Sequence, residues 1–528
     1  MEFKFIPLDY DYIDDEEGKP VIRIFGKTDK HEQICVLDTC KPYFYIVPTK
    51  RTNIDKFIKI IENTAFENAG RKCYVEKVAK VKKKDLGKEV TALKIIVSNP
   101  KDAHAIKSYI KDHNNYECSR EVDLNFITRY ITEKKIKPLF WYKVEGDIKE
   151  KQPFKIIKAK KITEIKELPF TPKALAFDIE TEDPEPEKGK VLMLSLVGKN
   201  FQKVITWKKF KNAPKEIEFV DNEKALLLKF REYVKQQNPD ILTGYFSDGF
   251  DLPFLRERFR LNKIPFDLSW DSSSMNLIRG ALSSAKFTGL VHLDIFKFVS
   301  GAIVASLNTE TLSLNDVSEE LLGETKVKID FNPWTLAQEL DAMNSKELKR
   351  FCFYNLQDSV LAYKLFEKLW PMMIELTKLI QEPLFTVTRN GYTHLLENFI
   401  IHHLDQFNEF IRNRPTRDEI SERRAREKSP GAFVLEPRYG LYENMVVFDF
   451  TGMYTTLLIT FNVDPSTIQE VKKSQKYDIE VDLEGKKRYF FFDKKKKAIF
   501  PELINYTFLK REKIKEKLNK KYDPVLSA

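Results

Sequence analysis

The stretch KALAFDIET, residues 173–181, places two carboxylates inside an apolar run. Its Leu, Phe and Ile alternate with other residues, so the segment predicts a buried β-strand. Side chains two residues apart on a strand share a face, which directs Asp178 and Glu180 toward one point. Neighbouring carboxylates repel each other and lose hydration, and a divalent cation with oxygen ligands, Mg²⁺ or Mn²⁺, relieves both penalties. A strand end whose acids simply face water is the competing interpretation.

Two further segments carry acids in settings that suit the same chemistry. In GYFSDGFDLPFL, Asp251 follows an aromatic residue in a turn-rich segment that runs into a helical pattern. In FYNLQDSVLAYKL, Tyr354 and Asp358 are four residues apart in a predicted helix and therefore share a face. The sequence therefore predicts a set of four carboxylates that holds two metal ions about 4 Å apart for phosphodiester hydrolysis. Its members are Asp178, Glu180, Asp251 and Asp358.

In such a site, one ion activates the attacking water and the other stabilises the leaving 3′ oxygen. Tyr354 would orient that water through its hydroxyl group. An ordinary tyrosine of an amphipathic helix is the alternative for this residue.

The composition is that of a globular protein with room for three or four domains. The 528 residues carry a net charge of +10, with 12% aromatic residues. A basic balance favours a polyanionic partner. No apolar run approaches the length of a membrane span and the acidic start is no signal peptide, so we expect a soluble cytoplasmic protein without a membrane partner. The five cysteines lack CxxC spacing, so neither zinc nor a disulfide framework is implied.

Periodicity and turn signals predict the order of elements along the chain. The amino-terminal third should be mainly β, and an α/β region with further helices should follow. We expect antiparallel strands over residues 20–48, a helix at 54–67, a strand at 92–97, a lysine-rich linker at 155–167, a strand at 174–181, helices at 223–237 and 345–380, a helical block at 384–426, a strand at 443–450 and a charged helix at 509–521.

Several motifs in fixed order resemble those of the family B DNA polymerases. FDIET, YFSDGFD and YNLQD look like the three 3′–5′ exonuclease motifs of that family. The segment GAFVLEPRYGLYENMVVFDFTGMYTTLLITFNVDPST is similar to the palm segment that carries the first polymerase motif. The amino-terminal GKPVIRIFGKT and KPYFYI, with WYKVEG, look like the archaeal branch. The resemblance covers nearly the whole chain.

The resemblance implies a multidomain α/β and α+β fold. A β-rich N-terminal domain, a ribonuclease-H-like 3′–5′ exonuclease domain, a partial palm and partial fingers would follow one another. The implied ranges are 1–167 for the N-terminal domain, 168–370 for the exonuclease domain, 371–411 for a helical return to the N-terminal domain, 412–500 for the first part of the palm and 501–528 for the first helix of the fingers.

The resemblance also assigns roles to residues. Asp178, Glu180, Asp251 and Asp358 would be the exonuclease metal ligands, with Tyr354 assisting. In the palm, Asp449 would be a polymerase metal ligand with the backbone of Phe450 beside it. Tyr454 would lie under the sugar of the incoming nucleotide and exclude a ribose. The cations Arg511 and Lys515 would grip the triphosphate; a solvated charged helix is the alternative for that pair. Each active site would take two Mg²⁺ or Mn²⁺ ions.

Archaeal relatives capture template uracil in a pocket of the N-terminal domain. Tyr12, Pro42 and Ala92 fall at positions that resemble the lining of this pocket. Ala92 is smaller than the usual valine of the family.

The chain departs from the family pattern at several positions. Phe246 stands where the family usually has Asn, and Gly249 where Asn or Ser is common; these side chains help to position the DNA end. The tyrosine of the switch between synthesis and editing falls at Ser429. Met453–Thr456 replace the usual Leu-Tyr-Pro-Ser.

The printed sequence also ends where the second fingers helix would begin. The later palm carboxylates of the family are missing from it, so Asp449 lacks its partner acid. The expectation is the large piece of a split polymerase or a truncated record, with synthesis requiring a second chain.

The resulting hypothesis is a family B DNA polymerase with a 3′–5′ proofreading exonuclease, acting on primer-template DNA and deoxynucleoside triphosphates. A sliding clamp is a further expected partner, although no clamp-binding motif is visible. The alternatives are a self-sufficient metal-dependent 3′–5′ exonuclease and a non-catalytic DNA-binding subunit. The complete carboxylate set argues against the last of these.

Overall fold

The computed structural model describes residues 1–68, 70–150, 154–280, 283–326, 343–426, 434–450, 452–483 and 485–520. The chain forms two compact units. The first contains Met1–Cys40 and Ile127–His402, and the second contains Lys41–Phe126 and the described residues between His403 and Lys520. Among the described helices, none has the length and the apolarity that crossing a membrane requires.

The first unit begins with a closed five-stranded barrel. Its strands follow the order β1 (Glu2–Asp14), β2 (Pro20–Thr28), β3 (Gln33–Thr39), β10 (Lys155–Glu164) and β9 (Tyr142–Glu150). The predicted lysine-rich linker at 155–167 is therefore wrong, because most of it is a barrel strand. Ile157 is fully buried while Lys158 and Lys160 point outward, so the lysines alternate with core residues as a half-buried strand requires.

A six-stranded mixed sheet forms the centre of the first unit. Strand β12 is antiparallel to β11, whereas β15 and β18 run parallel to it and to each other. This is the α/β arrangement that the sequence predicts for the region. The strand order is β14 (Ile217–Phe219), β13 (Phe201–Thr206), β12 (Val191–Gly198), β11 (Ala174–Thr181), β15 (Ile241–Gly244) and β18 (Val291–Asp294).

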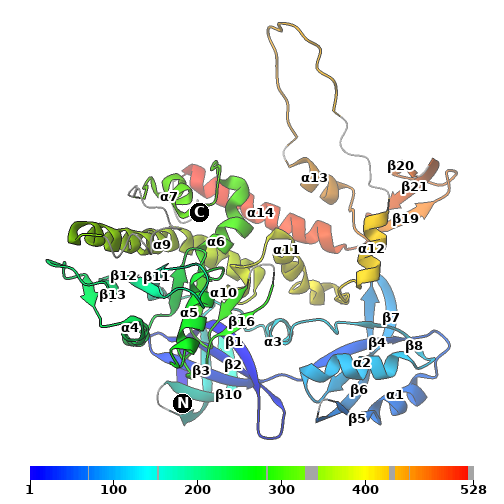
Figure 1. Cartoon of the computed structure of the whole chain (residues 1–528). Helices are drawn as coiled ribbons and strands as arrows, with labels where there is room; N and C mark the ends of the chain where they lie inside the picture. Colours follow the sequence, from blue (N-terminus) through cyan, green and yellow to red (C-terminus); the bar gives the residue numbers. More distant parts are fainter. Residues whose placement is uncertain are drawn as a thin grey trace. The chain divides into compact units, whose positions relative to one another are not determined.

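Helices pack on this sheet, and two of them have the predicted ends. Helix α4 (Glu223–Gln237) begins after an Asn222 cap and ends at Asn238 in the left-handed conformation. Helix α9 (Ser345–Ile380) begins with a capping box at Asn344 and continues through Pro371. Figure 1 shows α9 beside β11 and β12, the strands with which it shares most of its contacts. A predicted domain boundary at 370/371 falls inside this helix.

Shorter elements complete the first unit. The predicted helical block at 384–426 is broken, because Asn390-Gly391 and Pro415 interrupt it with residues that favour turns. The elements are α3 (Phe126–Lys134), α5 (Asp251–Leu261), β16 (Asn276–Ile278), β17 (Ser284–Lys286), α6 (Ile295–Phe298), a π-helical turn (Val299–Ile303), a 3-10 turn (Val304–Ser306), α7 (Leu314–Leu322), α10 (Leu384–Val387) and α11 (Tyr392–Ile401).

The second unit contains a five-stranded sheet with two helices. The predicted helix at 54–67 ends at Glu62, because Asn63 caps it and residues 65–68 form a hairpin strand. The strand order is β5 (Ala65–Asn68), β6 (Arg71–Asp85), β7 (Lys88–Val97), β4 (Tyr43–Pro48) and β8 (Tyr116–Arg120). The helices are α1 (Ile54–Glu62) and α2 (Ala103–Lys111), with a 3-10 turn (Pro100–Asp102) before α2.

The later part of the second unit has a small sheet and a long terminal helix. Its elements are a 3-10 turn (Leu404–Phe407), α12 (Arg417–Ala425), α13 (Met453–Thr460), β19 (Ile468–Val471), β20 (Ile479–Leu483), β21 (Lys486–Phe492) and α14 (Ile499–Lys520). The predicted strand at 443–450 is wrong: these residues form an exposed coil (Figure 1). A strand needs a hydrogen-bonded neighbour, and no described strand pairs with this segment.

Candidate metal centre

Three carboxylates meet where β11 faces α9. Asp178 and Glu180 come from the strand, and Asp358 comes from the helix. One oxygen atom of each lies within 4.8 Å of those of the other two. The strand period of two aligns the first pair, as predicted, and the packing of α9 on the sheet supplies the third. Among the residues that the structure describes, no other group of three acidic, cysteine or histidine side chains meets this criterion.

The fourth predicted ligand, Asp251, adjoins this group without belonging to its tight core. It is the first residue of α5 and is 5% exposed. Its Oδ1 accepts a hydrogen bond of 3.3 Å from the backbone amide of Ile179, the residue between the two strand acids. Asp251 therefore lies next to β11 at the level of the cluster.

Burial raises the pKa of all four acids, and the charges of neighbouring carboxylates raise it further for Asp178, Glu180 and Asp251. Burial is the largest cause, and it raises the pKa of Glu180 to about 8 and that of Asp251 to about 7. The pKa of Asp178 lies well above its usual range because of burial and then the charges of Asp358, Asp251 and Glu180. Removing water from four carboxylates destabilises their charged forms, so the site favours a multivalent cation that restores them.

Lys326, which sequence reasoning missed, already places a cation at the cluster. Its Nζ lies 2.6 Å from Oδ2 of Asp358 and 5.2 Å from the ring centre of Tyr354. Burial alone would lower the pKa of Lys326, but the charges of Asp358 and Tyr354 outweigh it and raise the pKa. Burial is also the main cause of the raised pKa of Tyr354, followed by the charge of Asp358. Lys326 follows α7 in a segment without periodicity, so the sequence offers no signal for its role.

Asn355 is a second residue that the sequence analysis did not single out. Its Nδ2 donates a hydrogen bond of 2.7 Å to Oδ2 of Asp178. The Oδ1 atoms of Asn355 and Asp358 are buried and accept no hydrogen bond within the described protein. Buried acceptors in native proteins are normally satisfied, so these two oxygens suit a bound ion or its water ligands. The position of Asn355 in the sequence, between Tyr354 and Asp358, is the signal that could have identified it.

A buried ionic network holds the loop that leads to Asp251. Asp248 is fully buried, and its Oδ2 accepts a hydrogen bond of 2.8 Å from Nε of Arg389 and lies 3.1 Å from Nζ of Lys297. Its Oδ1 accepts a hydrogen bond of 2.7 Å from the amide of Ala285 and faces Nδ1 of His292 at 3.3 Å. Despite burial, the nearby cations lower the pKa of Asp248 strongly.

Asp294 fixes the same loop from the end of β18. Its carboxylate accepts hydrogen bonds of 2.9 Å from the amides of Phe246 and Asp248. It also contributes to the raised pKa of Asp251, after burial. The position of Asp251 therefore depends on contacts from three separate segments of the chain.

The predicted polymerase residues lie in the second unit and form no comparable site. Asp449 and Phe450 lie in the exposed coil, where Phe450 is 75% exposed. Tyr454 lies on α13 and is 73% exposed. Arg511 and Lys515 lie on α14, each within 4 Å of Glu512. In the described part of the chain, no acidic group of the kind found in the first unit includes Asp449.

The residues predicted to line a uracil pocket are divided between the two units. Tyr12 lies on β1 of the first unit, whereas Pro42 and Ala92 belong to the second. Ala92 is fully buried against Tyr45, Val47 and Phe410. The Ser429 position of the predicted synthesis-editing switch and the final residues 521–528 lie outside the described residues.

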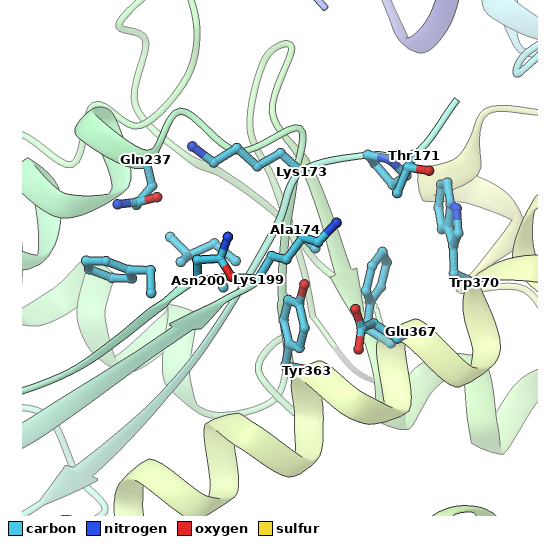
Figure 2. Close-up of a pocket in the computed structure, with 14 residues that line it drawn as sticks. Thr171, Lys173, Ala174, Lys199, Asn200, Gln237, Tyr363, Glu367 and Trp370 are labelled. Carbon is cyan, nitrogen blue, oxygen red and sulfur yellow. The ribbon is translucent and has the colours of Figure 1, made fainter. Parts of the chain in front are cut away.

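A cavity of about 650 Å³ opens at the other end of β11. Figure 2 shows Tyr363, Glu367 and Trp370 of α9 on one side, with Lys173, Lys199 and Asn200 around the opening. None of its lining residues belongs to the carboxylate cluster, and Glu367 is the one acid among them. The cavity is therefore distinct from the metal centre.

Comparisons with known proteins agree with this architecture. A model described as DNA polymerase family B, exonuclease domain, matches residues 118–317, and one described as DNA polymerase family B matches residues 383–528. The DNA polymerase of Pyrococcus glycovorans is 32% identical over 98% of this chain and 61% of its own length. That of Thermococcus gorgonarius is 31% identical with the same coverage.

A solved structure is similar as well. The family B DNA polymerase from the hyperthermophilic archaeon Pyrobaculum calidifontis matches with a TM-score of 0.77 at 22% identity, over 99% of this chain and 66% of that one. The mixed sheet lies within residues 118–317, the range that matches the family B exonuclease domain. The chain belongs to DNA polymerase family B. It spans 61% of the length of the Pyrococcus glycovorans and Thermococcus gorgonarius polymerases.

Proposed function

We propose that this chain is a metal-dependent 3′–5′ exonuclease that forms part of a family B DNA polymerase. The observation that carries the proposal is the meeting of Asp178, Glu180 and Asp358 within 4.8 Å, with Asp251 beside them. Raised pKa values and two unsatisfied oxygens support a site that is incomplete without cations. The substrate is single-stranded DNA at a 3′ end.

Asp178, Glu180, Asp251 and Asp358 would hold two Mg²⁺ or Mn²⁺ ions. When bound, such ions supply Lewis acidity to the scissile phosphate and acidify a bound water. Tyr354 orients the attacking water through its hydroxyl group. Lys326 holds Asp358 and Tyr354 in place, and Asn355 holds Asp178. These contacts fix the directions in which the carboxylate oxygens point.

For synthesis, we propose that Asp449 binds a polymerase metal ion, with Phe450 beside it. Tyr454 selects the deoxyribose, and Arg511 with Lys515 binds the triphosphate. Among the described residues no acidic group surrounds Asp449, which supports a second chain as the source of the remaining polymerase ligands. Primer-template DNA, deoxynucleoside triphosphates and that second chain are the proposed partners, with a sliding clamp as a further one.

The five-part division of the chain belongs to the same proposal. The segments would be the N-terminal domain (1–167), the exonuclease domain (168–370), the helical return (371–411), the first part of the palm (412–500) and the first helix of the fingers (501–528). The role of Tyr12, Pro42 and Ala92 in sensing template uracil is proposed on the same basis.

A 5′-labelled primer, alone and annealed to a template, separates the candidate functions. The purified chain with Mg²⁺ should shorten the primer stepwise from its 3′ end and should not extend it when nucleotides are added. Extension should appear only when a second chain that carries the later palm carboxylates of the family is present. A self-sufficient exonuclease predicts shortening without any extension, and binding without shortening would leave only the DNA-binding subunit.

A further inference from the structure

Phe246 is an exposed aromatic residue at the edge of the metal centre. Strand β15 runs parallel to β11 with Thr243 opposite Ala176, so the chain leaves β15 at the sheet edge where Asp178 and Glu180 lie. Phe246 is the second residue past the strand and is 38% exposed.

The backbone of Phe246 is unfavourable for its own side chain. Its φ is +61°, in the left-handed region that non-glycine residues rarely adopt and that Asn tolerates better than Phe. The amide of Phe246 donates to Oδ1 of Asp294 at 2.9 Å, which holds this conformation. A residue kept in a strained conformation near a site points to a role for its side chain.

Neighbouring residues also hold the ring in place. It packs edge-on against Phe296, with ring centres 5.1 Å apart and an interplanar angle of 87°. A Cβ atom at Gly249 would lie 2.4 Å from Cζ of Phe246, so the ring occupies the space that a side chain at 249 would need. Phe246 and Gly249 therefore form a matched pair.

We propose that Phe246 is a stacking platform for the 3′-terminal base of single-stranded DNA at the metal centre. This inference rests on the proposed exonuclease function and adds a base-binding subsite to it. Every base has a π-face, so a phenyl ring binds the terminal base with little dependence on sequence. An Asn at this position would instead offer hydrogen bonds that differ between bases.

Oligonucleotides that end in a normal nucleotide or in an abasic tetrahydrofuran residue test the platform. The wild-type chain should cleave the normal end about ten-fold faster at subsaturating DNA, because only that end can stack. Phe246→Asn should bring this ratio close to one, and Phe246→Tyr should retain it. The Asn variant should fold, since Asn suits the left-handed backbone. Tyr109→Ala, which removes an exposed ring of the second unit, should keep the ratio.

The matched pair gives a second, independent readout. Gly249→Ser should lower the ratio, because its Cβ displaces the ring. In the Phe246→Asn background the same change should have no further effect. Equal losses from Gly249→Ser in both backgrounds would contradict the pairing.

A DNA-binding experiment with Ca²⁺ as the metal ion separates this inference from the exonuclease proposal. If no cleavage occurs at all, the proposed function fails, but the affinities for the two ends can still be compared by fluorescence anisotropy. A wild-type preference for the base-bearing end that Phe246→Asn removes would support the platform. A wild-type ratio near one, or a preference that survives in Phe246→Asn, would overturn it.

Discussion

Glu180 shows how burial prepares a side chain for a cation. In the unfolded chain its pKa has the ordinary value of about 4.3, whereas in the folded protein burial raises the pKa to about 8. Below about pH 4 both states hold the proton and folding carries no penalty. As the pH rises from about 4 to 8, the unfolded state loses its proton first, so the metal-free protein loses stability over this window.

Glu180→Gln should therefore stabilise the metal-free protein at high pH. The variant removes a group that resists ionisation and a charge that repels Asp358. In EDTA at pH 8.5, the unfolding midpoint of the first unit should rise by about 2–4 °C, with a smaller gain at pH 5. Differential scanning calorimetry at both pH values measures this. A lower midpoint at pH 8.5 would show that Glu180 does not carry the predicted penalty.

Lys326 tests whether the orientation of Asp358 and Tyr354 matters for hydrolysis. Lys326→Gln removes the ammonium group that both residues contact and should lower the single-turnover rate about ten- to hundred-fold. It should also shift the pH profile, because the Lys326 charge lowers the pKa of Asp358. Lys364→Gln, which loses a surface pair with Glu324, is the matched control. Equal rates in the two variants would remove Lys326 from the site.

At the scale of elements, a helix, a strand and a loop bring the four acids together. The loop between β15 and α5 depends on the buried pair of Asp248 with Arg389, which comes from the segment after α10. Arg389→Met should leave Asp248 with fewer partners and lower the free energy of unfolding of the first unit by about 3 kcal/mol. It should also weaken hydrolysis by releasing Asp251. Urea denaturation measures the stability change.

Arg231→Met is the control for the stability loss expected of Arg389→Met. The pair of Arg231 with Asp267 is partly exposed, so its loss should lower stability by less than about 1 kcal/mol. Similar losses in the two variants would mean that the network around Asp248 has no special weight.

Local sequence patterns predicted the elements whose signals are local. The ends of α4 and α9 follow from caps and periodicity, and the pairing of Asp178 with Glu180 follows from the strand period. Strand β10 was missed because its lysines concealed a half-buried alternation. The strand predicted at 443–450 was wrong because pairing depends on a neighbour that the segment itself cannot reveal.

The remaining parts of the site depend on contacts between distant segments. Lys326 reaches Asp358 across 32 positions, and Arg389 reaches Asp248 across 141. Neither residue stands in a periodic pattern that marks it. The sequence could therefore predict which acids lie together, but not which cationic side chains contact them.

At the scale of the whole molecule, the two units carry two proposed activities of different completeness. In the first unit the acids already meet, whereas in the second Asp449 and Tyr454 are exposed. Tyr454→Ala, in enzyme reconstituted with the second chain, should raise ribonucleotide incorporation relative to deoxyribonucleotide at least about ten-fold, because the ring no longer excludes a 2′-hydroxyl. Steady-state incorporation of both nucleotides measures the ratio.

The exonuclease rate supplies the control for this variant. It should stay unchanged, since Tyr454 belongs to the other unit. An unchanged nucleotide ratio would reject the selection role, and a parallel loss of both activities would identify Tyr454 as a packing residue.

The most direct measurement of the central claim compares the wild-type chain with the double variant Asp178→Ala, Glu180→Ala. Both are given 5′-labelled single-stranded DNA with Mg²⁺ under single-turnover conditions. Loss of two ligands of a shared metal pair should lower the rate of 3′ shortening by about a thousand-fold or more. The double variant should remain folded, since it removes two buried charges that repel each other. Equal rates for the two proteins would contradict the assignment of the carboxylate cluster as the exonuclease site.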